Sequence, residues 1–285
     1  MNYQFAIKEP LSLRIFSPVQ PIGFKYQEVK EGDPFAAGMK DYNRILFVLE
    51  GKLKISCNEF INRQVHEKEF VLIPIAADVA CKALSPLKII WFSFEVFVNH
   101  FDKNYLRELI AASSKSDYMF VKLAFCEPMD NFIQHLLLYI RQKMDKKILQ
   151  EIKQMELSVI FRSFYSIENM AALFHPLIGK SYHFRLQVLR NYRKENHVDG
   201  LAERIGLEKR SFSRQFKDEF NQSPYQWLLN QKAKHIRFSL AESDKTLEEI
   251  RKEHGFKFAG HFTRFCKEQF NCTPVKLRRQ LAYEG

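Results

Sequence analysis

Four hydrogen-bonding or cationic residues lie at helical spacing in the last third of the chain. Arg210, Ser213, Arg214 and Lys217 are spaced i, i+3, i+4 and i+7, which places them on one face of an α-helix. Arginine can bond guanine bidentately, and lysine neutralises phosphate. Such a face could enter the major groove of DNA, or it could be a charged surface that only meets solvent.

The same kind of face occurs again about fifty residues later. Gly260, Thr263, Arg264 and Lys267 have the same spacing, and a threonine methyl group can touch the methyl group of thymine. For one helix the two readings are equally plausible, and the second copy favours DNA binding. Gly260 removes a side chain from the second face, so we expect the first helix to supply more of the base readout.

Each of these helices follows a shorter helix and a tight turn, and this unit is written twice between Leu201 and Arg279. The turn glycines, Gly206 and Gly255, are 49 residues apart, whereas the later residues repeat at an offset of 50, so the second turn has one extra residue. The apolar face that the first unit must bury carries Phe212, Phe216 and Phe220.

The exits from both units predict the same helix ends. Asn221 and Asn271 tolerate the left-handed conformation that closes a helix, and Ser223 or Thr273 can cap the next one. Between the units, Pro224 to Ala241 predicts one helix of about 18 residues, or roughly 27 Å. Such a strut could hold two recognition helices about one DNA turn, roughly 34 Å, apart.

Helices are also predicted on either side of these elements. Ser181 to His197 has the pattern of a helix that braces the first unit. Thr246 and Glu249 form a Thr-x-x-Glu capping box, which predicts the start of the second unit's first helix.

The last hundred or so residues resemble the AraC/XylS transcription regulators, whose DNA-binding domain has two helix-turn-helix units joined by a linking helix. The resemblance is carried by the Leu-Ala pair before Gly206, the Gly255-Phe256 pair, the Phe-x-Arg before each Lys, and Thr273 to Arg278. The chain departs from the family pattern at Arg251, Gly260, Cys266, Asn221 and Asn271.

The resemblance implies a bacterial, cytoplasmic transcription regulator, more often an activator than a repressor. Its partners would be double-stranded DNA and RNA polymerase, and it would often respond to a small molecule. The residues that would contact DNA are those of the two faces: Arg210, Ser213, Arg214, Lys217, Gly260, Thr263, Arg264 and Lys267.

Charge divides the chain into two expected domains. The formal net charge is +11, and residues 181–285 hold 21 Lys and Arg against 13 Asp and Glu, which leaves 23 against 20 in residues 1–180. The positive field therefore lies where a polyanion would bind. We expect an α+β protein with a sensor and dimerisation domain in residues 1–180 and a DNA-binding domain in residues 181–285.

The first domain begins with a series of short strands. The pattern from Ile45 to Ser56 predicts a hairpin with one wet face and a turn at Glu50-Gly51, and Glu69 to Ile75 and Leu87 to Val98 predict further strands. Such strands favour a closed or sandwiched β-barrel, whose mouth could take a small ligand. This segment resembles the cupin-type sensor barrel of the same family.

Two apolar helical stripes follow the strands. Either could pack on the barrel or on a second copy of the chain, and a homodimer is one expectation. The stretch from Ser166 to Lys180 has few Gly and little charge, so it predicts a short connection between the domains rather than a loose tether. The stripes are Phe132, Ile133, Leu136, Leu137, Ile140 and Met144, then Ile148, Ile152, Met155 and Val159.

The sequence gives little support to catalysis, so we expect no cofactor, no metal and no enzyme. A metal-dependent cupin enzyme needs a His-x-His pair, but His66 is the only histidine of the strand region. Cys266, Cys272 and His261 match no common zinc spacing. The five cysteines form no CxxC pair, which favours reduced thiols, and no apolar run is long enough to cross a membrane.

Three alternatives remain beside a regulator. A cupin-type enzyme fused to a DNA-binding domain would need the missing His-x-His pair. An alkyl-transfer repair protein, which shares this DNA-binding unit, would need a reactive cysteine in a Pro-Cys-His context that is absent. A protein that coats DNA without preference would not need two spaced recognition helices.

Overall fold

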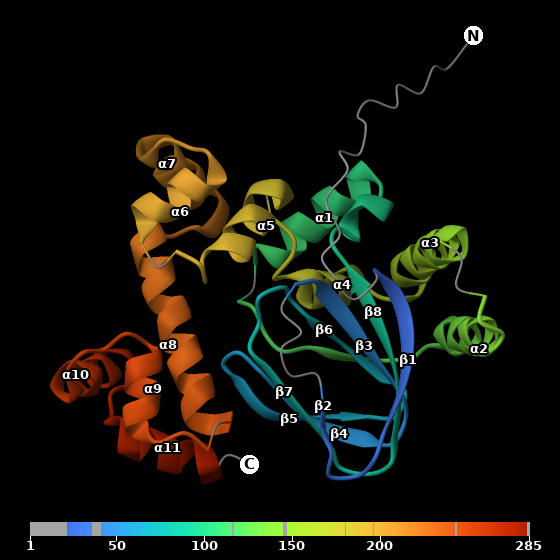
Figure 1. Ribbon diagram of the computed structural model, residues 1–285. Coiled ribbons are helices and arrows are strands. Elements are labelled where there is room, and N and C mark those ends of the chain that lie inside the picture. The colour runs from blue at the N-terminus through green and yellow to red at the C-terminus, as the bar shows by residue number, and fades with distance from the viewer. Residues whose placement is uncertain are drawn as a thin grey trace.

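The computed structural model describes residues 22–35, 41–115, 117–144, 147–179, 181–195, 197–242 and 244–283. Within them, two antiparallel β-sheets come first and a group of helices comes last (Figure 1). The prediction of an α+β chain, with strands in the N-terminal part and an all-helical C-terminal part, is confirmed.

The two sheets differ in size and order. The larger sheet has the order β1-β8-β3-β6-β9, and the smaller one β2-β7-β4-β5. The strands of the larger sheet are β1 (Gly23–Val29), β8 (Leu87–Phe94), β3 (Asn43–Glu50), β6 (Glu69–Ile73) and β9 (Lys122–Ala124). Those of the smaller sheet are β2 (Pro34–Phe35), β7 (Val79–Ala83), β4 (Lys52–Cys57) and β5 (Phe60–His66).

Strand β3 shows how the sheets are layered, because it is buried on both faces. Leu46 and Val48 belong to the apolar core between the two sheets, whereas Ile45 and Phe47 belong to a second core beneath the helices. Successive side chains of a strand point to opposite faces, so a continuous apolar run suits this middle layer. The larger sheet therefore lies between the smaller sheet and helices α1 to α4.

The hairpin predicted from Ile45 to Ser56 is wrong. β3 pairs with β6 and β8, whereas β4 pairs with β5 and β7, so the chain passes from one sheet to the other at Gly51. Gly51 has φ +86°, and a Cβ there would collide with the carbonyl oxygen of Pro86. Local alternation predicts strands well but says nothing about which strand is the partner.

The helices that follow the strands pack on the larger sheet. They are η1 (Val98–His100), α1 (Lys103–Ser113), α2 (Glu127–Arg141), α3 (Lys147–Phe164) and α4 (Ile167–Phe174). Helix α4 occupies much of the stretch that was predicted to be only a connection, and its Met170 and Phe174 are buried in the core. The part that connects the two groups of elements is thus shorter than expected, residues 175–181.

The two apolar stripes have different surroundings. On α2, Phe132, Ile133 and Leu136 are buried against the larger sheet. The stripe on α3 faces outward, because its residues, Ile148, Ile152, Met155 and Val159, are all more than half exposed. Of the two expected partners, the strands or a second copy of the chain, the first stripe therefore packs on the strands. The second stripe does not pack on them.

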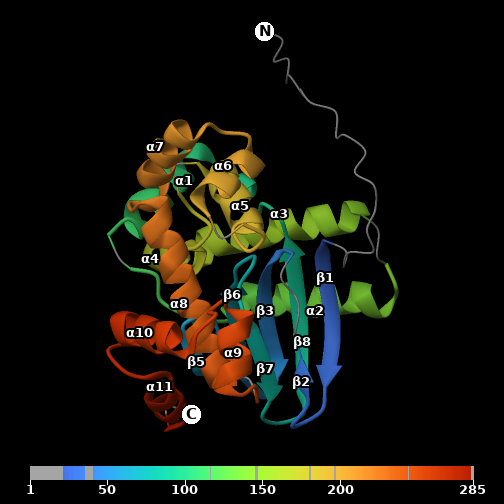
Figure 2. The ribbon, with the colours of Figure 1, turned by 60° about the vertical axis from the view of Figure 1, so that its left-hand side comes forward.

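The C-terminal helices build two further cores at the two ends of one long helix, α8 (Figures 1 and 2). Helices α5 to α7 lie at one end and α9 to α11 at the other. The predicted boundary at residues 180 and 181 falls after Ile178, the last residue of the core beneath α1 to α4, and before Phe184, the first helical residue of the next core. The boundary itself stays a prediction. The helices are α5 (Tyr182–Asn191), α6 (Val198–Ile205), α7 (Lys209–Phe220), α8 (Pro224–Glu242), α9 (Leu247–Glu253), α10 (Ala259–Phe270) and α11 (Pro274–Tyr283).

Candidate nucleic-acid interface

The first helix-turn-helix consists of α6 and α7, with a left-handed turn between them. Gly206 closes α6 at φ +77°, a conformation that suits glycine. Phe212 and Phe216 are fully buried against Phe184 and Trp227, as the apolar stripe predicted. The opposite side of α7 is therefore the one left open to a partner.

The second helix-turn-helix repeats this arrangement with α9 and α10. Gly255 has φ +75°, and Phe262 and Cys266 are buried in the core at the lower end of α8. Cys266 is thus a small core residue, and burial raises the pKa of its thiol to about 12. His261 is exposed, and among the described residues no three His, Cys, Asp or Glu side chains lie close enough to hold a metal.

The predicted DNA-binding residues form two reading faces, which we define as Arg210, Ser213, Arg214 and Lys217 on α7 and Gly260, Thr263, Arg264 and Lys267 on α10. On both helices the cationic residues are exposed, whereas Ser213 and Thr263 are half-buried. Gly260 is exposed too. The structure thus brings each predicted set to one side of its helix; contacts between these residues and bases stay a prediction.

The cations of the reading faces have few partners of their own. Arg264 lies 3.9 Å from Glu268, and both side chains are more than 60% exposed. Among the described residues, Arg210, Arg214 and Lys217 make no ion pair. An exposed pair contributes little to stability, so these charges remain available to phosphates or bases.

The helix ends confirm the predicted capping chemistry. Asn221 and Asn271 close α7 and α10 in the left-handed conformation, at φ +54° and +56°. The Ser223 and Thr273 hydroxyls then accept hydrogen bonds from backbone N–H groups of α8 and α11. At the start of α9, Thr246 and Glu249 form both bonds of the predicted capping box.

A buried ion pair that the sequence did not reveal fixes α5 on α7. Arg185 Nε lies 3.0 Å from Glu219 Oε1, and the Glu219 side chain is almost fully buried. Glu219 also accepts a hydrogen bond from the backbone N–H of Ser181, and the Arg185 guanidinium stacks over Phe220 at 4.7 Å. The predicted bracing helix is thus attached to the reading helix by a fully satisfied charge pair.

Helix α8 is confirmed as a single helix, from Pro224 to Glu242, with one unit at each end. Every residue from Trp227 to Glu242 is buried or half-buried, although many are polar. Some of the polar ones contact the part of the chain before residue 181, called the strand domain below, and others, such as Asn230 and Ser239, bond within the helical part. Lys234 pairs with Glu59 at 2.6 Å, and Glu242 accepts a hydrogen bond from Ser56.

One acidic residue of the strand domain, Asp78, is the centre of this contact. Its carboxylate pairs with Arg193 at 2.9 Å and with His235 of α8 at 2.5 Å. Arg193 also donates two hydrogen bonds to the carbonyl oxygen of Ala76, which has φ +62°. Alanine is rarely left-handed, so the backbone is strained where the two groups of elements meet.

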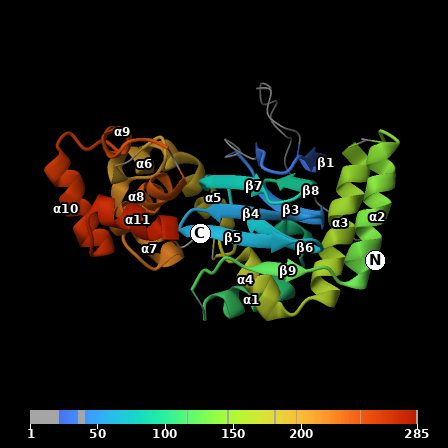
Figure 3. The ribbon, with the colours of Figure 1, turned by 90° about the horizontal axis from the view of Figure 1, so that it is seen from below.

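The strand domain also shares apolar cores with the helical domain. Ile61 of β5 packs into the core of the second unit, and Ala76 packs into that of the first. Tyr192 is buried beside His235, with ring centroids 5.8 Å apart, and burial raises the pKa of its hydroxyl to about 12. Seen from below, α8 lies between the strands and α10 (Figure 3).

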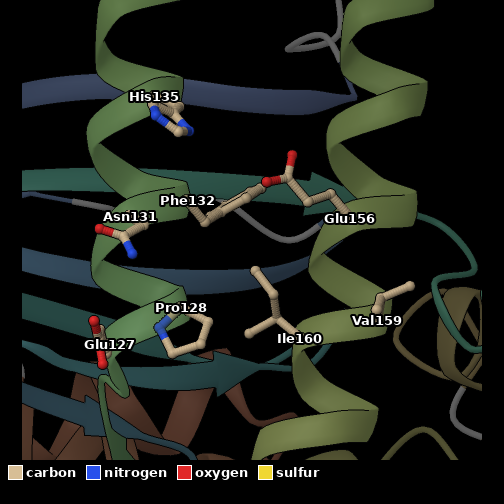
Figure 4. A pocket seen from close by; sticks show the side chains of 8 residues that line it. All are labelled: Glu127, Pro128, Asn131, Phe132, His135, Glu156, Val159 and Ile160. Carbon is tan, nitrogen blue, oxygen red and sulfur yellow. The ribbon is translucent and has the colours of Figure 1, made fainter.

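Two recesses could hold a small molecule. One of about 620 Å³ lies between α2 and α3, where His135 and Phe132 of α2 face Glu156 of α3 (Figure 4). Another of about 350 Å³ lies where the β4–β5 turn meets α8 and α10, and Lys234 and Arg237 line it. The predicted barrel mouth is not among them, and the space between the sheets is filled by apolar side chains. His66 lies on the exposed surface.

No helix within the described residues is both long and apolar enough to span a bilayer.

The C-terminal residues are similar to known helix-turn-helix proteins. The family described as "Helix-turn-helix domain" matches residues 201–280. The HTH-type transcriptional activator RhaS of Yersinia pestis (strain Pestoides F) is 29% identical over 103 residues, which are 36% of this chain and 38% of RhaS. RhaS of Yersinia pseudotuberculosis serotype O:1b gives the same values. The chain thus spans 38% of the length of these curated relatives.

Solved structures are similar over different shares of the chain. Apo ToxT from Vibrio cholerae is 12% identical, with a TM-score of 0.41, over 90% of this chain and 97% of that one. An AraC-type regulator from Chromobacterium violaceum is 28% identical, with a TM-score of 0.29, over 31% of this chain and 80% of that one.

Proposed function

We propose that the chain is a sequence-specific DNA-binding transcription regulator, since its C-terminal domain belongs to the AraC/XylS family. The observation that carries the proposal is the pair of reading faces at opposite ends of one helix, α8. Exposed Arg and Lys side chains on both faces suit guanine edges and phosphates. A rigid strut of this kind would hold the two faces on one side of a duplex.

The finer parts of the function come from the relatives and from charge. The curated relatives are named activators, and we extend that role to this chain, which would bind near a promoter and recruit RNA polymerase in the cytoplasm. The excess of positive charge in residues 181–285 favours association with DNA over other partners. Catalysis and a cofactor have no part in this proposal.

The contact around Asp78 supports a response to a small molecule. Both Arg193, which follows α5, and His235, on α8, pair with this one carboxylate, so displacing it would weaken the attachment of the helix that sets the spacing of the reading faces. An effector shifts such an equilibrium only by its differential affinity for the two arrangements. The recess lined by Lys234 and Arg237 is one place from which an effector could act.

The outward stripe of α3 supports a homodimer. Ile152 and Val159 lie on that stripe and are more than half exposed, and a sustained apolar stripe of this kind usually marks an interface. Ile152→Glu should shift sedimentation toward a smaller species, whereas Glu151→Gln, on the same helix, should not. If the wild-type chain sediments as a monomer at high concentration, the homodimer is wrong.

The DNA-binding proposal is tested by selection. Full-length protein would be used to select duplexes from a random pool at one fixed salt concentration, followed by footprinting of the recovered sequences. We expect two protected segments about one helical turn apart, and competition by unrelated DNA at least about a thousandfold weaker. Recovery of unrelated sequences with no shared motif would refute sequence-specific binding.

A further inference from the structure

Phe258 is 65% exposed at the N-terminus of α10, the helix that carries the second reading face. It occupies the N-cap position of α10, where a polar side chain would normally bond the free backbone N–H groups, and α10 has no such bond. The position therefore combines an exposed aromatic ring with an uncapped helix. Since α7 also lacks such a bond, the distinctive feature is the exposed ring, which a partner would explain better than the free protein does.

The surroundings of Phe258 differ from those of the first unit. Along the first turn of α10, Ala259, Gly260 and His261 are all exposed, and Phe258 packs edge-on against His261 with centroids 5.6 Å apart. A Cβ at Gly260 would meet no atom within 4 Å. This end of α10 therefore presents an apolar ring and open backbone to a partner.

The first unit presents charge at the same place. Glu208 is the N-cap residue of α7, and Lys209 and Arg210 follow it, all exposed. Lys209 pairs with Asp199 at 2.8 Å on the surface. The first turns of α7 and α10 therefore offer chemically different surfaces. Further along the helices, the Arg and Lys of one reading face recur in the other.

Arg251 holds the turn that presents Phe258. Its side chain is mostly buried, and its guanidinium donates hydrogen bonds to the carbonyl oxygens of Phe256 and Lys257. Phe256 is packed against Phe262 of the core, two residues before the exposed ring. In the first unit the equivalent residue is Ala202, which cannot make these bonds. The longer second turn therefore has an anchor of its own, and Phe258 projects from a fixed backbone.

Duplex DNA is the partner that fits this surface. Lys257 precedes the ring, and Arg264 and Lys267 are exposed further along the same helix; these cations suit a polyanion rather than an apolar protein surface. In helix-turn-helix domains the N-terminal residues of the second helix contact base edges. The apolar group that a base edge offers in the major groove is the C5-methyl group of thymine.

We propose that Phe258 determines specificity by packing on thymine methyl groups in the half-site bound by the second unit, and that Arg251 is the positioning residue for it. The inference rests on the proposed DNA binding and adds to it the chemistry of one half-site. The first unit then reads by hydrogen bonds from arginine, and the second unit reads by apolar contact.

The test replaces thymine by deoxyuridine, which pairs alike but lacks the methyl group. In an operator obtained by selection, each thymine of the second half-site would be replaced in turn, and full-length protein titrated at one salt concentration. We expect about fourfold weaker binding at one or two positions, the equivalent of about 0.8 kcal/mol for one buried methyl group. Phe258→Ala should bind the thymine operator more weakly than the wild-type protein does. It should also bind the thymine and deoxyuridine operators equally.

Two further variants separate readout from folding. Tyr225→Ala removes another exposed ring, at the start of α8 and 68% exposed, and should keep the full thymine preference. Arg251→Ala should reduce the preference while the footprint over the first half-site stays unchanged. Circular dichroism of each variant checks that the helices are intact.

Two results would overturn the inference. Wild-type protein could bind thymine and deoxyuridine operators equally, or Phe258→Ala could keep the whole preference, whether or not its self-association changes. Failure of the underlying function looks different, because then no operator is recovered from selection at all.

Discussion

At the scale of single residues, Arg214 and Arg264 occupy equivalent positions in the two repeats but have unequal neighbours. Arg214 shares its face with Arg210 and Lys217, both exposed. Arg264 has the bare Gly260 one turn before it and Glu268 3.9 Å away. That exposed pair is weak, so the main difference between the two arginines is the side chain that Gly260 lacks on the second face.

We therefore predict that Arg214→Ala weakens operator binding more than Arg264→Ala. Loss of a bidentate contact should cost about 1–3 kcal/mol and relax one operator position. Lys252→Ala is the control, because it removes an exposed cation from α9, outside both reading faces. Titrations at one salt concentration measure all three, and the reverse order of the two arginines would contradict the prediction.

A second prediction concerns His254, which lies 3.1 Å from Ser239 of α8. Burial lowers the pKa of His254 from 6.5 to about 4, so the folded chain holds it neutral. The unfolded chain takes up the proton below pH 6.5, hence stability is present above that pH and is lost as pH falls toward 4.

Chemical denaturation at pH 7 and pH 5 tests this. Between pH 7 and pH 5, the free energy of unfolding of the wild-type chain should fall by at most about 2 kcal/mol more than that of His254→Gln. Glutamine keeps a hydrogen-bonding group near Ser239 and does not titrate. An equal loss in both proteins would show that His254 is not responsible.

At the scale of elements, α5 is attached to α7 by a charge pair whose carboxylate is buried and whose guanidinium is only 17% exposed. Removing one partner of a buried pair leaves the other charge unpaired, so Glu219→Gln should destabilise the chain by about 3–5 kcal/mol. Asp199→Asn breaks the exposed pair with Lys209 and should cost less than about 1 kcal/mol. Urea denaturation compares the two variants, and similar losses would mean that the Arg185–Glu219 pair is not a special anchor.

The elements that sequence predicts well are those whose signals are local. The internal repeat predicted both helix-turn-helix units. Asn221, Asn271 and the capping hydroxyls predicted the helix ends, and Thr246 predicted the start of α9. The pairing of β3 was missed because Gly51 sends the next strand into another sheet, a fact about strands far along the chain.

The candidate site was predicted in the same uneven way. Helical spacing alone was enough to place Arg214 and Lys217 on one exposed side of α7. Phe258 was missed because an aromatic residue near a helix start is expected to be buried. Glu219 was missed because its partner, Arg185, is 34 residues away and a charged residue normally suggests an exposed position.

At the scale of the whole molecule, the strand domain should tune DNA binding without deciding which sequence is bound. Residues 181–285 alone should protect the same operator bases as the full chain, but more weakly and with no response to an effector, because a dimer raises effective concentration without new base contacts. Footprints of both proteins on one operator test this. A fragment that has lost all sequence preference would contradict it.

Asp78→Ala is the full-length counterpart of that fragment. Arg193 and His235 would lose their shared carboxylate, so the two domains should separate more often. Limited proteolysis between residues 175 and 181 should become several times faster, while the operator bases protected stay the same.

The partial burial of α8 on several sides has a consequence for how freely this protein can vary. From Trp227 to Glu242 the helix offers no exposed position, because two units and the strand domain use its different sides. A new side chain there must fit against up to three structural parts, namely the two helix-turn-helix units and the strand domain. A new side chain on the outer side of α3 meets only solvent in the single chain. In a saturation mutagenesis screen, α8 should therefore accept far fewer replacements than its polar composition suggests.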